Sequence, residues 1–187
     1  TFPYKPSVAF RMAYAGDNIL INFQVTEDSV RAVAPSDNGH VWEDSCCEFF
    51  VSPVNDGTYY NIECNCAGTL LVGFGPGREG REHLPENVLQ QVDRWSSLGR
   101  LPFDERVGQC QWQMALVIPT LCTIQDCNCR MQTCAPTSIS VAIKRRNLTS
   151  CLGIPLLCLS PTSIVRLSLA KFHSRVNVFY RPFHDYV

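Results

Sequence analysis

Hydrophobic and polar side chains alternate with a period of two along much of the first 120 residues. In the segment 18–26, for example, Ile19, Ile21 and Phe23 share one face, while Asn22 and Gln24 point the other way. This alternation is typical of a half-buried β-strand. Five segments are predicted to be strands: 18–26, 48–51, 59–66, 69–74 and 111–118.

Turn residues separate these strands, as in the segments 36–39 and 55–57. The segment 85–94 is predicted to form one short helix, because Val88, Leu89 and Val92 lie on one side of it. Many short strands with almost no helix indicate an all-β fold. We therefore predict an antiparallel β-sandwich of the immunoglobulin-like or jelly-roll-like kind.

The composition of the chain changes near residue 120. Residues 1–120 carry 8 Lys and Arg against 15 Asp and Glu, a net charge of −7, whereas residues 121–187 carry 8 against 2, a net charge of +6. Six of the 11 cysteines lie in this shorter second part. We predict a folded domain in residues 1–120 and an irregular, basic, cysteine-rich tail in 121–187 that adds no further strand.

Several classes of function are not favoured by the composition. No apolar run reaches the roughly 20 residues that span a bilayer, so no membrane span is predicted. The basic tail is rich in Leu, Ser and Cys rather than Lys, so a nucleic-acid partner is not predicted either. Cys127 and Cys129 are spaced CxC, without the ligand spacing of a zinc site, and no metal is assigned to them.

Two neighbouring segments carry the candidate chemistry. Asn61, Glu63 and Asn65 share the polar face of the strand 59–66, and Trp42 lies in the segment 41–50 with three carboxylates. An indole can stack on the apolar face of a pyranose while amides and carboxylates bind its hydroxyls, which is a common arrangement for sugar binding. The alternative interpretation is that Trp42 belongs to the core and the acidic side chains are solvated.

Two other functions were weighed. Asp44 and Glu48 suggest a glycoside hydrolase, which needs a general acid together with a nucleophile or base. No nucleophilic triad accompanies that pair. A haem- or partner-binding sandwich would take its axial ligands from Met12, Met114 or Met131, but no Met/His pair is visibly placed. Neither alternative has a complete set of functional residues, so no catalytic residue and no cofactor is predicted.

The segment 73–80 is rich in glycine, contains Arg78 and is followed by Arg81. It could cradle a phosphate, but it lacks the Lys-Ser/Thr of a P-loop and no helical pattern follows it directly. We interpret it as a loop next to a polar site.

The strings VWEDSCCEFFVSP and YYNIECNCAGTLL resemble the family 9 carbohydrate-binding modules, in particular the stand-alone bacterial family 9-like proteins. The shared pattern is a tryptophan, then D-S-x-x-E-x-F on one strand, then an alternating strand that ends in N-x-x-G. The resemblance covers about residues 3–119. It implies a β-sandwich that binds an oligo- or polysaccharide without catalysis, and such a ligand favours a periplasmic or extracellular location over the cytoplasm.

The resemblance also implies roles for individual residues. Trp42 would stack on the sugar and Glu48 would hydrogen-bond its hydroxyls. The family has an arginine and an asparagine two residues apart on the next strand; here Asn65 matches and Glu63 departs, so an arginine after that strand is the candidate for the missing cation. Some family members hold a structural calcium ion, for which no residues are assigned here. The candidate carbohydrate-binding residues are Trp42, Glu48, Glu63, Asn65, Arg78 and Arg81.

The tail lacks the further strands and the second aromatic wall that the resemblance implies. Reverse translation suggests a cause. Codons can be chosen for residues 136–144 that, displaced by one base, read ANFYQCGD, and the same displacement can give HFLSW from 148–153 and DFHRPAFFG from 161–170. These strings resemble the C-terminal motifs of family 9-like proteins. We predict that the chain is translated out of frame after about Thr120, and that its stability and sugar binding are impaired.

Overall fold

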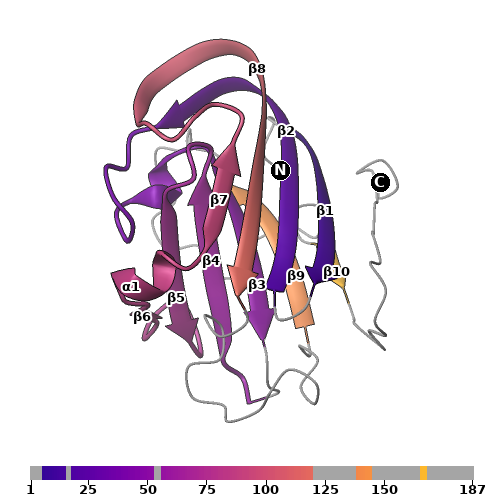
Figure 1. Cartoon of the computed structure of the whole chain (residues 1–187), viewed down its shortest axis with the longest axis vertical. Coiled ribbons are helices and arrows are strands. Elements are labelled where there is room, and N and C mark those ends of the chain that lie inside the picture. Colours follow the sequence, from indigo (N-terminus) through magenta and orange to yellow (C-terminus); the bar gives the residue numbers. More distant parts are fainter. Residues whose placement is uncertain (1–5, 16–17, 53–55, 120–137, 145–164, 168–187) are drawn as a thin grey trace.

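The computed structural model describes residues 6–15, 18–52, 56–119, 138–144 and 165–167, the last two ranges by their backbone. Two antiparallel sheets are stacked face to face, as Figure 1 shows, and the short helix α1 (Glu86–Leu89) lies at one side of them. This arrangement is the all-β sandwich predicted from the period-two pattern.

The first sheet has the strand order β1-β2-β8-β7. Its members are β1 (Ser7–Ala15), β2 (Asn18–Ala32), β8 (Phe103–Pro119) and β7 (Asp93–Ser96). The pairing of β2 with β8 is irregular between Glu27 and Ser29 and again between Val30 and Ala32. Such irregularities bend a strand pair and increase its twist.

The second sheet has the order β10-β9-β3-β4-β5-β6. Its members are β3 (Cys46–Ser52), β4 (Tyr59–Asn65), β5 (Leu70–Gly75), β6 (Glu82–His83), β9 (Ser138–Lys144) and β10 (Val165–Leu167). A single 3-10 turn, η1 (Val41–Glu43), precedes β3 and lies in the connection from the first sheet to the second. The fold thus places the motif around Trp42 at the start of a strand in the middle of the second sheet.

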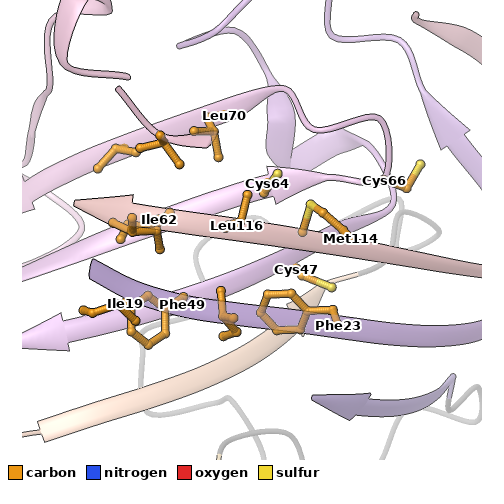
Figure 2. Packing of buried hydrophobic residues seen from close by; sticks show 14 of the residues in the cluster. Ile19, Phe23, Cys47, Phe49, Ile62, Cys64, Cys66, Leu70, Met114 and Leu116 are labelled. Carbon is orange, nitrogen blue, oxygen red and sulfur yellow. The ribbon is translucent and has the colours of Figure 1, made fainter. Parts of the chain in front are cut away.

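The core lies between the two sheets and uses the faces that the sequence pattern predicted. Phe23 of β2 and Met114 of β8 belong to the same buried cluster as Phe49 of β3 and Ile62 of β4, and Figure 2 shows these four among the packed side chains. Burial of each such side chain contributes roughly 1.5–3 kcal/mol. The polar end of Trp112 is also satisfied, because its Nε1 donates a hydrogen bond to Glu27 Oε1 at 2.6 Å.

Two parts of the first sheet were not expected from the sequence. The segment 85–94 was predicted as one helix, but α1 ends at Leu89 and the chain continues into β7. The reason is tertiary: β7 pairs with β8, so that Arg94 lies opposite Leu116 and Trp95 opposite Ala115. The first strand, β1, was not assigned from the sequence, and it pairs with β2 along its whole length.

The prediction that no strand follows residue 120 is wrong, because the structure has two strands beyond it. Ser138–Lys144 form β9, which pairs antiparallel with β3 and places Ile139 opposite Val51 and Val141 opposite Phe49. Val165–Leu167 then pair with β9 as β10. The segment 138–144 alternates in sequence, and backbone hydrogen bonds need little more than an extended chain beside an open strand. Residues 120–137, 145–164 and 168–187, including most of the sequences tested for a frame slip, lie outside the described residues.

Among the described residues, no helix has the length and apolar character needed to cross a bilayer.

We expect Phe23→Ala to lower the free energy of unfolding by about 3–5 kcal/mol, because it removes a ring that is almost fully buried between the sheets. Gln24→Ala, on the opposite face of the same strand, should change it by less than about 0.5 kcal/mol. Urea unfolding followed by tryptophan fluorescence measures both variants. Equal losses for the two would contradict the assignment of the core face.

Candidate functional site on the outer face of the second sheet

Alternation along β4 separates a core face from a polar face. Tyr60, Ile62 and Cys64 are buried in the core, so Tyr59, Asn61, Glu63 and Asn65 lie on the side that faces away from the first sheet. We call this side of the second sheet the outer face. On β3 the register places Glu48 opposite Glu63, Phe50 opposite Asn61 and Cys46 opposite Asn65. Residues predicted from two separate motifs therefore meet on one surface.

Trp42 lies at one margin of this outer face. Its indole packs, half-buried, against a small cluster formed by Ala34, Val41, Cys46 and Leu71. Leu71 of β5 lies opposite Glu63 of β4, which in turn lies opposite Glu48 of β3. The cluster therefore lies next to these two carboxylates. The imidazole of His40 stacks on the indole with ring centroids 4.6 Å apart, and His40 Nδ1 lies 3.4 Å from Glu43 Oε1. Trp42 thus belongs neither to the main core nor to a fully solvated surface.

The connection between β2 and β3, residues 33–45, carries Trp42, and we call it the Trp42 segment. The side chains of Asp44 and Asn65 hold it in place. Both side chains are 0% exposed. The carboxylate of Asp44 accepts hydrogen bonds from the backbone N–H groups of Val33 and Ala34 and from Asn65 Nδ2, each at 2.9 Å. Asn65 Oδ1 accepts the N–H groups of Ala67 and Thr69. The D-S and N-x-x-G parts of the sequence pattern therefore have a structural role, and the side chain of Asn65 is buried and hydrogen-bonded within the chain.

The burial of Asp44 also bears on the hydrolase alternative. A general acid or nucleophile must reach its substrate. Both oxygens of Asp44, however, accept hydrogen bonds from the chain itself. In addition, Arg31 Nε lies 3.6 Å from Asp44 Oδ1. The geometry does not support catalysis by an Asp44/Glu48 pair.

The second alternative, haem binding, is not favoured by the positions of its candidate ligands. Met12 and Met114 are both buried in the core, and Met131 lies outside the described residues. No group of three or more His, Cys, Asp or Glu side chains among the described residues could hold a metal ion. The candidate cysteines Cys127 and Cys129 lie in the part of the chain that is not described.

The two predicted arginines are placed differently. Arg81 lies against the outer face: a Cβ built on Gly73 would stand 3.5 Å from both Cβ and Cδ of Arg81, and its guanidinium carbon is 5.8 Å from the centre of the Tyr59 ring. Because Gly73 has no side chain, the arginine stem can cross β5 at this point. Arg78 is exposed in the loop between β5 and β6.

Two polar atoms on the outer face lack hydrogen-bond partners among the described residues. Asn61 Nδ2 donates to Glu63 Oε1 at 2.7 Å, but Asn61 Oδ1 is buried and accepts nothing, and the hydroxyl of Tyr59 is in the same situation. Buried polar atoms are nearly always hydrogen-bonded in folded proteins, so such exceptions mark positions where a ligand or water can bind. Tyr59 was not among the candidates, although its place in the alternation puts it on this face.

An ion pair outside the outer face fixes the other end of the Trp42 segment. Arg94 Nη1 and Nη2 donate to the two oxygens of Asp37, both at 2.7 Å, and Asp37 Oδ1 accepts the N–H of Leu70. Asp37 and Arg94 line an open cleft of about 480 Å³, which also includes Glu86, Asp93 and Arg100. The donors of Arg94 are used within the chain, so this cleft has a structural explanation.

A two-layered β-sandwich with an aromatic ring and buried hydrogen-bonding groups on one outer face belongs to the class of β-sandwich ligand-binding modules. The chain matches the family model of Carbohydrate-binding family 9 over residues 1–136, and it belongs to this family. The resemblance inferred from the motifs is thereby confirmed, and membership supports sugar binding in general.

The chain is also similar to a crystal structure of a proposed carbohydrate-binding protein from Bacteroides uniformis ATCC 8492. The two sequences are 38% identical, the match covers 96% of this chain and 80% of that one, and the TM-score is 0.71. No curated protein matches the chain at a significant level.

We expect the Asp37–Arg94 pair to make stability depend on acid pH. Burial raises the pKa of Asp37, but the hydrogen bonds from Arg94 and Leu70 and the charges of Arg94 and Arg100 outweigh it and hold the pKa below its ordinary value of 3.8. A depressed pKa stabilises the folded state above the unfolded value, and this contribution is lost as the pH falls below about 3.8.

Asp37→Asn should therefore be less stable at neutral pH and should lose less stability on acidification than the parent chain. Urea midpoints measured from neutral pH down to pH values below the ordinary carboxyl range test this. Asp104→Asn is the control, because Asp104 is an exposed carboxylate on β8, away from the Asp37–Arg94 pair. Identical acid slopes for Asp37→Asn and the parent would contradict the prediction.

Proposed function

We propose that this chain binds an oligo- or polysaccharide, without catalysis, on the outer face of the second sheet. Trp42 supplies the aromatic surface, and Glu48, Glu63 and Asn61 supply hydrogen-bonding groups beside it. The observation that carries the proposal is the pair of unpartnered polar atoms, Asn61 Oδ1 and the Tyr59 hydroxyl, on the same face as the two carboxylates. A ligand rich in hydroxyls can satisfy atoms of this kind.

Each candidate residue has a definite part in the proposal. Glu48 and Glu63 contact the sugar directly, and Arg81 closes the Tyr59 end of the face with a cationic donor. Asn65 acts through Asp44 and positions the Trp42 segment without touching the ligand, which its complete burial supports. Arg78 remains a peripheral candidate, because it is exposed on the loop that leads to Arg81.

The aromatic part of the site is tested by removing the indole. We expect Trp42→Ala to weaken binding of the best neutral oligosaccharide by about tenfold, which corresponds to a loss of roughly 1.4 kcal/mol of stacking. A glycan array selects the oligosaccharide, and titration calorimetry measures the dissociation constants. Trp95→Ala is the matched control, because Trp95 is 55% exposed and lies in the first sheet. Equal effects of the two substitutions, or the failure of every sugar to bind, would contradict the proposal.

The absence of catalysis has its own measurement. We expect the selected oligosaccharide to be recovered intact after prolonged incubation with the protein, since Asp44 is unavailable as a partner for Glu48. Chromatography of the sugar detects cleavage. Turnover that disappears in Glu48→Gln would support a hydrolase instead.

We also propose that sugar binding is impaired in this chain because its sequence beyond about Thr120 is read out of frame. The reversal of net charge, the excess of cysteine and the three family-like strings recovered by a one-base displacement support this idea. The nucleotide sequence around the codon of Thr120 tests it directly. A chain with the restored frame is expected to unfold at a higher temperature and to bind the selected oligosaccharide more tightly; an unchanged affinity would contradict impairment.

A further inference from the structure

The imidazole of His40 lies over one face of the Trp42 indole, the ring that the proposed site offers to a sugar. The two ring centroids are 4.6 Å apart and the ring planes are inclined by 30°, so the rings are stacked. Elsewhere the indole packs against the small cluster that includes Leu71. An indole has only two faces, and a sugar ring that stacks on it needs one of them. The imidazole therefore occupies a face on which a sugar would stack.

The 3-10 turn η1 and the residue before it bring His40 and Glu43 together. Residues three apart eclipse each other in such a turn, and the backbone N–H of Glu43 donates to the His40 carbonyl at 3.1 Å. The Nδ1 atom of His40 lies 3.4 Å from Glu43 Oε1. The carboxylate of Glu43 thus holds the imidazole next to an indole that lies only two residues further along the chain.

These contacts hold the imidazole only weakly. The side chain of His40 is 71% exposed and that of Glu43 is 48% exposed, and ion pairs between exposed side chains contribute little free energy. The hydrogen bonds that form η1 join backbone atoms, so rotation of the His40 side chain can uncover the indole without unfolding the turn. Exposed side chains change rotamer within nanoseconds. The imidazole can therefore leave the indole before a sugar arrives.

We infer that His40 regulates the proposed sugar site by competing with the sugar for the Trp42 indole. This inference rests on the proposed function, because it describes how that same site becomes accessible. In the free protein the imidazole covers the indole, and a sugar stacks only after the imidazole has turned away. The apparent affinity is then the intrinsic affinity multiplied by the fraction of molecules in which the indole is uncovered.

Removal of the imidazole should tighten binding of the neutral oligosaccharide that the glycan array selects. We expect His40→Ala to lower its dissociation constant about threefold to tenfold, the range that one aromatic contact of ordinary strength would give. His40→Phe keeps a ring beside the indole and should not show this gain. Arg106→Ala is the matched control, because it removes an exposed side chain that stacks on Phe103 in the first sheet. Titration calorimetry measures all three variants.

Rate constants distinguish competition from a direct contact between His40 and the sugar. A covered indole slows association, whereas a contact with the bound sugar slows dissociation. We therefore expect His40→Ala to raise the association rate constant by about the same factor as the affinity, and to leave the dissociation rate constant unchanged. Stopped-flow tryptophan fluorescence measures both. In a Trp42→Ala background the His40 substitution should have no effect, because no indole is left to cover.

The possible failures separate this inference from the proposed function. Weaker binding by His40→Ala, with faster dissociation, would make His40 a sugar contact and overturn the competition, while the sugar site would stand. An unchanged affinity, or an equal gain in the Trp42→Ala background, would overturn the inference as well. Thermal unfolding establishes that each variant is folded, which the exposure of His40 favours. If neither the parent nor His40→Ala binds any sugar on the array, the proposed function itself fails.

Discussion

The buried carboxylate of Asp44 is the interaction on which the candidate site depends. It lies at the end of the Trp42 segment and receives three hydrogen bonds, two from the backbone of the chain leaving β2 and one from Asn65 at the end of β4. A fully buried charge is tolerated only when such donors surround it. The same bonds fix the indole relative to β3 and β4. These bonds tie the connection between β2 and β3 to the end of β4.

The second sheet divides its residues between two tasks. On β4, Ile62 and Cys64 pack against the first sheet, while Asn61 and Glu63, between them in sequence, form the polar outer face. Burying amides and carboxylates costs free energy unless their hydrogen bonds are made. The unpartnered atoms of Asn61 and Tyr59 on this face are the observation that supports the proposed binding site. Arg81 and Trp42 border this face at its two ends.

Period-two patterns predicted the strands and their core faces because alternation is a local property of the sequence. The predicted motif also brought Trp42, Glu48 and Glu63 to one surface. The local pattern could not reveal that the Asn65 side chain donates a hydrogen bond to Asp44. That bond joins residues 21 positions apart and depends on the register of β3 with β4. Nor could it show that Arg94, predicted to lie in a helix, belongs to β7, where it pairs with β8 and donates to Asp37. Tertiary contacts override the weak helical preference of that segment.

The position of β9 bears on the proposal that the tail is read out of frame. Without β9, one edge of β3 would present unpaired backbone N–H and C=O groups, which can pair with almost any extended segment. The segment 138–144 meets that requirement through its alternation, whichever reading frame produced it. The described residues of the proposed site all lie between His40 and Arg81, before the change in composition near residue 120. A tail read out of frame would therefore weaken the sandwich and deprive the ligand of a second wall, while the indole, the carboxylates and Asn61 would keep the relative positions that β3, β4 and the bonds of Asp44 impose.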